Sequence, residues 1–163
     1  MRPTLSAFAL ASSLALPIAL RAQGGVATGT KAPAAAVETL DGKPASLGSY
    51  VGTGPTLIEF WATWCSNCKE LEPSMAAAEK KYAGKVRFVT VAVGVNQSVE
   101  RVKRHAAAHP VPGTLYYDRT GAAADAYDVP ATSYIVVLDR TGKVVYTGVG
   151  GDQNVDAAVR KGL

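Results

Sequence analysis

The chain has 163 residues, a hydrophobic share of 48% and a formal net charge of +4, which suits one domain with its own hydrophobic core. The charge is too small to indicate nucleic-acid binding, so we expect no nucleic-acid partner. Two cysteines are also too few for a secreted scaffold stapled by several disulfides.

The first 22 residues have the organisation of a secretory signal peptide. Basic Arg2 precedes an apolar run from Leu5 to Leu20, and the small residue Ala22 follows at a position suited to cleavage. The run contains serines and Pro17 and is short for a membrane span, which needs about 20 residues. We therefore expect residues 1–22 to direct export to the periplasm or another extracytoplasmic compartment. An uncleaved membrane anchor is the alternative.

Residues 23–33 are rich in Gly, Ala and Thr without an apolar period, which is typical of a flexible linker. The remaining residues, 34–163, are predicted to form one domain. Its first unit is a small β-hairpin from Ala36 to Leu47, with Asp41-Gly42 at the turn. The apolar run 56–61 then has the length and composition of a buried central strand.

Strands and helices alternate through the rest of the chain. Helical spacing extends over 65–82, Ser98 is suited to cap a helix to about 108, and Asp152 to cap a last helix to about 161. A short helix is expected over 121–127. Further strands are expected at 86–93, 114–117, 133–138 and 143–147. This order predicts an α/β fold with a central mixed β-sheet flanked by helices.

The cysteine pair lies where the strand at 56–61 gives way to the first helix. In Trp64-Cys65-Ser66-Asn67-Cys68 the first cysteine is at the helix N-terminus, where unpaired N–H groups and the helix dipole favour a thiolate. The second comes one turn later, so its sulfur can face the first. We predict a redox-active disulfide in which Cys65 attacks and Cys68 resolves the mixed disulfide.

A C-x-x-C motif is also half of a zinc site, but the chain has no second one. His105 and His109 are four residues apart and can share a helix face. Because Pro110 follows them directly, we expect solvent-facing residues at a helix end rather than metal ligands. We predict no metal and no cofactor.

Several motifs surround the cysteine pair. The stretch Leu57 to Cys65, the turn Asp41-Gly42-Lys43 and the segment Val129-Pro130-Ala131-Thr132 together resemble the thioredoxin superfamily, most closely its exported TlpA/ResA-like branch. The resemblance covers roughly Lys31 to Leu163. It implies a thioredoxin-like fold with an N-terminal β-hairpin and an inserted helix-strand unit between about Ser98 and Tyr117.

The resemblance also implies roles for individual residues. Glu59 takes the place of the family's buried acid, which exchanges a proton with Cys68; an outward-facing carboxylate without a role is the alternative. Pro130 is expected to follow a cis peptide bond beside the reactive sulfur, with Val129 pairing its backbone with an extended substrate. An ordinary trans proline is the alternative. Trp64 is expected to flank the dithiol and shape the docking surface.

The function expected from these residues is that of a dithiol reductase of disulfides in exported proteins. Apocytochrome c during cytochrome c maturation and copper-site thiols are example substrates. A thiol oxidase or isomerase, and a copper-binding chaperone using Cys65 and Cys68 as ligands, are the alternatives. The centre Ser66-Asn67 lacks the proline of thioredoxin and the histidine of strongly oxidising relatives. With two cysteines, a monomeric reductase needs an external electron donor, for which we expect a membrane thiol carrier.

Overall fold

The computed structural model describes residues 24–163, so the predicted signal peptide or anchor, residues 1–22, lies outside the described residues. Within them, no helix has the length and apolarity that crossing a membrane requires. The strands are β1 (Ala36–Thr39), β2 (Pro44–Ser46), β3 (Thr56–Trp61), β4 (Arg87–Val93), β5 (Thr114–Asp118), β6 (Tyr134–Leu138) and β7 (Val144–Val149). The helices are α1 (Ser66–Lys81), α2 (Val99–Ala108), α3 (Ala122–Ala126) and α4 (Val155–Arg160), with a 3-10 helix η1 (Leu47–Tyr50).

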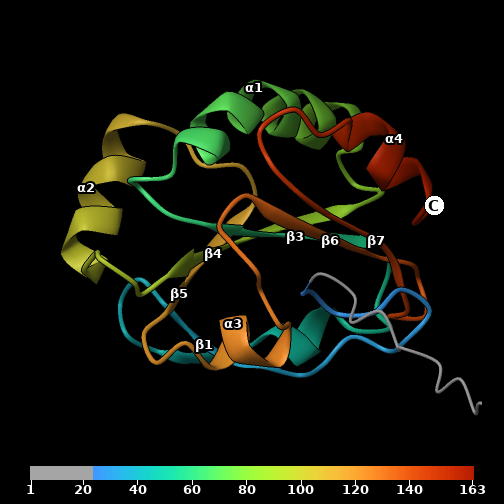
Figure 1. The fold of residues 1–163 in the computed structure, drawn as a ribbon, viewed down its shortest axis with the longest axis horizontal. Helices are drawn as coiled ribbons and strands as arrows, with labels where there is room; N and C mark the ends of the chain where they lie inside the picture. Colours follow the sequence, from blue (N-terminus) through green and yellow to red (C-terminus); the bar gives the residue numbers. More distant parts are fainter. Residues whose placement is uncertain (1–23) are drawn as a thin grey trace, which may run out of the picture.

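The strands form one mixed sheet in the order β2-β1-β5-β4-β3-β6-β7 (Figure 1). Strands β3, β4 and β5 are parallel, whereas β6 and β7 at one end and β1 and β2 at the other pair antiparallel. The predicted fold class, the N-terminal hairpin and the helix-strand unit of α2 and β5 are confirmed. Both central strands, β3 and β4, have neighbours on each side, which explains their nearly continuous burial.

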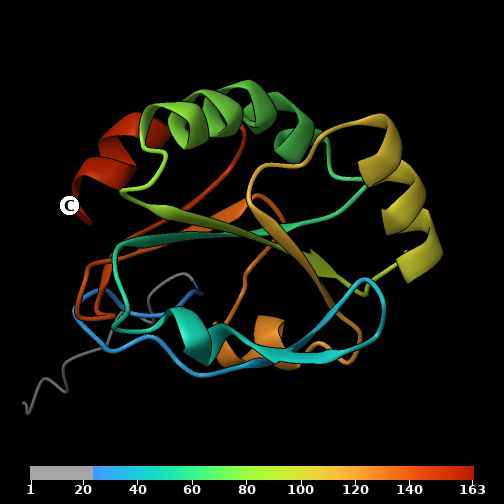
Figure 2. The same ribbon diagram turned by 180° about the vertical axis from the view of Figure 1, so that it is seen from behind.

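Helices cover both faces of the sheet. Helices α1 and α4 lie on one face, α3 and η1 lie on the other, and α2 stands to one side (Figures 1 and 2). Alternation along β3 divides its side chains between two hydrophobic clusters: Leu57 packs with residues of α1 and α4, and Ile58 and Phe60 with the opposite cluster. Glu59 comes two residues after Leu57 on β3, so its side chain points to the same face of the sheet, the face covered by α1.

Of the two predicted side-chain caps, one is confirmed and one is wrong. Ser98 caps α2 by accepting the N–H of Arg101 at 3.4 Å, as predicted. The predicted cap of α4 by Asp152 is wrong, because Asn154 accepts the N–H of Ala157 at 2.9 Å. A side-chain cap serves the N–H three residues ahead, and helix α4 begins at Val155, so Asp152 is two residues too early.

Residues 24–33 are bound to the domain, and the expected flexible linker is wrong for this stretch. Gly29 N donates to Val144 O at 2.8 Å and Ala32 N to Gly142 O at 3.0 Å, which ties the segment to the β6–β7 hairpin. Ala32 is also part of the core. Gly and Ala leave the backbone free to approach a neighbouring strand closely, and composition alone does not distinguish that use from a linker.

Candidate active site

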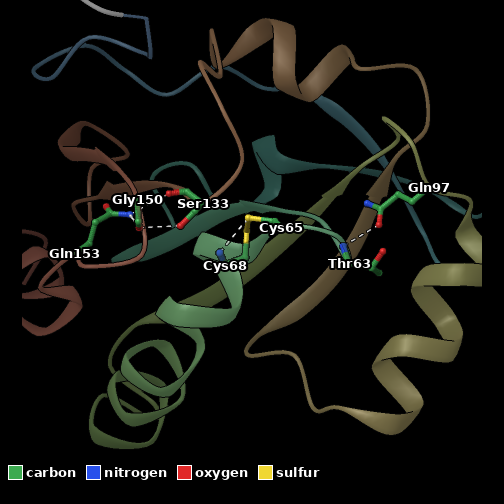
Figure 3. Close-up of a disulfide and its surroundings, with 7 residues drawn as sticks. All are labelled: Thr63, Cys65, Cys68, Gln97, Ser133, Gly150 and Gln153. Carbon is green, nitrogen blue, oxygen red and sulfur yellow. Dashed lines mark hydrogen bonds between the residues drawn. A yellow bond between two sulfur atoms is a disulfide. The ribbon is translucent and has the colours of Figure 1, made fainter.

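The two cysteines form a disulfide at the N-terminus of α1 (Figure 3). Cys65 is the N-cap residue, and its sulfur accepts the N–H of Cys68 at 3.0 Å. Cys65 is 8% exposed and Cys68 only 1%, so an incoming molecule reaches the first sulfur before the second. A thiolate at Cys65 lies at the positive end of the helix dipole, next to unpaired N–H groups.

The loop that carries Cys65 is held by a second loop, the one between β4 and α2. Thr63 N donates to the Gln97 side-chain oxygen at 2.9 Å (Figure 3). The amide nitrogen of Gln97 donates to Val93 O at 2.6 Å. The indole N–H of Trp64 donates to Val95 O at 2.8 Å, while its ring stays 42% exposed. These bonds fix the approach to the disulfide and leave an aromatic surface beside it.

Glu59 is a buried carboxyl group on the same face of the sheet as α1. It is 3% exposed, and its Oε1 has no hydrogen-bond partner among the described residues. Burial, with a smaller contribution from the charge of Glu72, raises the pKa of Glu59 to about 8. The predicted buried position is confirmed, and the alternative of an outward-facing Glu59 is wrong. Such a carboxyl can hold or release a proton near neutral pH.

Two cavities meet around these groups. A narrow one of about 10 Å³ is lined by Glu59, Cys68, Glu72, His105, Trp61, Val111 and Pro112. An open one of about 260 Å³ beside Cys65 is lined by Trp61, Trp64, Lys69, Glu72, His105, His109 and the residues of the Cys65 loop. Glu72, His105 and Trp61 belong to both cavities, so their side chains separate the buried carboxyl from the open side of the site.

The sequence predicts a solvent-facing His105, and this prediction is wrong, because His105 packs against the site. Its ring lies 5.1 Å from that of Trp61 and 5.0 Å from that of His109, measured between centroids. Burial and the neighbouring His109 lower the pKa of His105. His109, at the end of α2, is exposed as expected. Within residues 24–163 no group of three or more His, Cys, Asp or Glu side chains is placed to hold a metal ion.

Pro130 does not have the predicted geometry. Residues 24–163 contain no cis peptide bond, so the expected cis bond before Pro130 is wrong. The N–H of Val129 is already donated to Ala124 O at 2.9 Å. Pro130 is exposed and lines a different cavity, with Gly24, Tyr134, Thr147, Gly148 and Val149. The reason is position in the chain: Pro130 precedes β6 by four residues, and the chain reaches the disulfide later.

Ser133, the residue directly before β6, lies beside the disulfide (Figure 3). It is fully buried and has a φ of 65°, in the left-handed region. Its N–H donates to Phe60 O at 2.9 Å, and its hydroxyl donates to Gly150 O at 2.8 Å. Gln153 donates its amide N–H to both Ser133 O at 3.0 Å and Gly150 O at 2.8 Å. This network fixes the segment that faces the cysteines.

The fold and the helix-terminal disulfide define a thiol–disulfide exchange site on a thioredoxin-like scaffold. Comparison with known proteins agrees. The sequence profile of the Redoxin family matches residues 27–161. The chain is 32% identical over 127 residues to the thioredoxin-like protein YneN of Bacillus subtilis, covering 77% of this chain and 74% of that one. It is 30% identical over 125 residues to the thiol-disulfide oxidoreductase ResA of the same bacterium, covering 77% and 69%.

Solved structures lead to the same family. A thiol:disulfide interchange protein of the thioredoxin family from Chlorobium tepidum has a TM-score of 0.66 at 27% identity, over 84% of this chain and 98% of that one. The chain therefore belongs to the Redoxin family, in the TlpA/ResA-like branch of the thioredoxin superfamily. It is a thiol–disulfide oxidoreductase whose close cysteine pair is Cys65 and Cys68.

Proposed function

We propose that this oxidoreductase works as a dithiol reductase of disulfides in exported proteins, with Cys65 as the attacking and Cys68 as the resolving cysteine. The observation that supports electron transfer to the substrate is the buried Glu59 carboxyl, which lines the same cavity as Cys68. A dithiol becomes a strong oxidant when its reduced, thiolate form is stabilised. Here Glu72, and Glu59 whenever it is ionised, line the cavity at Cys68 and oppose a second negative charge there.

The residues between the cysteines support the same direction. Ser66 and Asn67 carry no positive charge, and both are exposed. The thiolate of Cys65 is therefore stabilised chiefly by the helix N-terminus. Lys69 lines the open cavity but is exposed to solvent, where charge is screened. A reduced form with this limited stabilisation gives up its electrons readily.

The exchange proceeds in two balanced steps. The Cys65 thiolate attacks a substrate disulfide, forming a mixed disulfide and releasing one substrate thiolate. Glu59, as carboxylate, then takes the proton of Cys68, and the resulting thiolate attacks the Cys65 sulfur. The second substrate thiolate leaves, the substrate has gained two electrons, and the protein holds the Cys65–Cys68 disulfide. An external dithiol must return it to the reduced state, since the chain has only two cysteines.

We assign substrate docking to the segment ending at Ser133, in place of Val129 and Pro130. Neither the N–H nor the C=O of Thr132 has a hydrogen-bond partner within residues 24–163, and Thr132 is only half-buried. A free backbone edge next to the sulfurs suits pairing with an extended peptide. The exposed ring of Trp64, the residue before Cys65, offers an apolar contact to the same substrate.

The proposed setting is extracytoplasmic. The signal-peptide pattern of residues 1–22 supports export, and an oxidising compartment supplies disulfides that need reduction. Apocytochrome c and copper-site thiols are substrates of the fitting kind, and a membrane thiol carrier is the fitting donor. The relative ResA carries the name of a thiol-disulfide oxidoreductase, which supports the exchange chemistry itself.

The reduction potential tests the direction. We expect a value near that of thioredoxin, about −270 mV, from equilibration with glutathione or dithiothreitol at neutral pH. A value near about −120 mV, where strong periplasmic oxidants lie, contradicts the reductase proposal.

Trapping tests the substrate class. A Cys68→Ser variant expressed with its signal segment is expected to accumulate mixed disulfides on Cys65 with exported proteins, because the resolving thiol is gone. The Cys65→Ser, Cys68→Ser double variant is the matched control and traps nothing. Absence of any thiol protein on Cys68→Ser contradicts exchange with exported substrates.

A further inference from the structure

The buried Glu59 carboxyl needs a route by which protons reach and leave it. At neutral pH a carboxyl with a pKa of about 8 is largely protonated, so it must lose a proton before it can accept the one on Cys68. Every residue of β3 is buried, and Glu59 is 3% exposed. The sheet and α1 therefore leave the carboxyl little direct contact with bulk water.

The narrow cavity provides the first part of a route. The carboxyl of Glu59, whose Oε1 is unpartnered within the described residues, lines it together with Cys68. Its volume of about 10 Å³ is close to the 10–15 Å³ or so that one water molecule requires. Glu72 and His105 are the other residues on its wall with titratable side chains besides Cys68. One water in this space has enough polar partners to pass a proton.

His105 also lines the open cavity beside Cys65. The same imidazole therefore borders both the narrow cavity at Glu59 and the open cavity. Its position is fixed by edge-on packing against Trp61 from β3. The charged and titratable groups around it are Glu72 and Lys69 from α1, and His109 and Arg101 from α2. Burial and His109 lower its pKa and Glu72 opposes this, which leaves a neutral ring at neutral pH. A neutral imidazole accepts a proton on one nitrogen and donates from the other.

We propose that His105 is a proton-relay residue, which exchanges the proton of Glu59 with solvent through the narrow cavity while Cys68 resolves the mixed disulfide. The proposal rests on the proposed function of Glu59 as the base for Cys68. In each turnover the Cys68 proton passes to the Glu59 carboxylate, then through the narrow cavity to His105, and from His105 to water in the open cavity. In this role His105 acts only through Glu59.

The test separates the two cysteine steps by reacting the reduced protein with excess 5,5′-dithiobis(2-nitrobenzoate) in a stopped-flow instrument. Attack by Cys65 releases one thionitrobenzoate at a rate proportional to the reagent. Attack by Cys68 on the mixed disulfide releases a second one at a rate independent of the reagent. The variant is His105→Gln, which keeps a polar side chain of similar size. Arg104→Gln is the matched control, because Arg104 is exposed on the same helix and lines neither cavity.

We expect His105→Gln to slow the second phase about tenfold or more, within the range of lost proton-transfer assistance, and to leave the first phase within about twofold. The second-phase pH profile should keep the rise toward pH 8 that ionisation of Glu59 causes. It should lose the part that His105 contributes at lower pH, because burial and His109 lower the pKa of His105. Arg104→Gln should behave as the wild type. In a His105→Ala variant, added imidazole should restore the second phase in a saturable way.

Several results would overturn the proposal. An unchanged second phase in His105→Gln means that protons reach Glu59 by another path, and slowing in Glu72→Gln alone would assign that path to Glu72. Equal slowing of both phases, or a defect in His105→Ala that imidazole does not restore, means that His105 supports packing only. Failure of the proposed function looks different: the wild type itself would show no second phase, or Glu59→Gln would leave that phase unchanged.

Discussion

The raised pKa of Glu59 makes the stability of the oxidised protein depend on pH in an unusual direction. In the unfolded chain a glutamate loses its proton near pH 4.5, whereas in the fold Glu59 keeps it to about pH 8. Between these values the folded state binds one proton more than the unfolded state, so stability falls as pH rises. Each pKa unit corresponds to about 1.4 kcal/mol. The unfolding free energy contributed by this group therefore falls by about 5 kcal/mol across the window, fully present below pH 4.5 and lost above pH 8.

The substitution Glu59→Gln isolates this effect, because the amide cannot ionise. We expect the unfolding free energy of the oxidised wild type, measured by urea denaturation from pH 4 to 9, to fall relative to that of Glu59→Gln as pH rises. The difference should change by several kcal/mol and level off above pH 8. Glu70→Gln, an exposed position on α1, is the matched control and should follow the wild type. A difference between wild type and Glu59→Gln that stays constant with pH would refute the assignment of a buried, protonated carboxyl.

Three further substitutions test parts of the site. Gly113→Ala places a Cβ in overlap with Phe88 O at a φ of 81° and should lower the unfolding free energy by about 3 kcal/mol or more. Gly121→Ala, with the same φ and open space around the Cβ, should cost about 1 kcal/mol. Equal losses in the two variants would contradict the steric cause. Gln97→Ala removes the acceptor of the Thr63 N–H. It should slow insulin-disulfide reduction several-fold and lower the unfolding free energy by about 1–2 kcal/mol. An unchanged rate would mean that the Cys65 loop holds its shape without Gln97. Gln153→Leu removes both hydrogen bonds to the Ser133 and Gly150 carbonyls. It should lower the unfolding free energy by about 1–3 kcal/mol and raise KM for a disulfide substrate. An unaltered KM would argue against docking along Thr132 and Ser133.

Sequence alone was sufficient for the fold and for the centre of the site because both rest on local patterns. A continuous apolar run predicts a strand buried on both faces, and β3 is buried throughout. The spacing of Cys65 and Cys68 across one helical turn predicts a disulfide at a helix N-terminus, which the structure contains. A glutamate inside such a strand has no exposed side to turn to, so burial of Glu59 follows from the same run.

Sequence alone misplaced the segment opposite the dithiol because that segment is defined by its distance from a strand, not by a residue type. The resemblance to the thioredoxin superfamily places this segment at Val129 and Pro130, because these residues match the family's proline motif. The chain instead passes the disulfide at Ser133, immediately before β6. The available signal was positional: β6 pairs with β3 in the register Phe60 to Tyr134, so the residue before Tyr134 must lie near the end of β3, where the Cys65 loop begins.

His105 and His109 are a second case in which sequence alone does not fix where a side chain lies. Pro110 correctly predicts that α2 ends at about Ala108, and His109 is exposed as a helix-end residue should be. Whether the preceding turn of α2 faces solvent or the site depends on how the β4–β5 connection crosses the sheet. Parallel strands require a crossover, and this one brings α2 beside the end of β3, where His105 meets the ring of Trp61. The loop bonds of Gln97 to Thr63 and Val93 hold the start of that crossover against the Cys65 loop. The same connection therefore fixes the reactive loop and places an imidazole at the wall of the Glu59 cavity, so the position of the dithiol and its access to protons depend on one element of the fold.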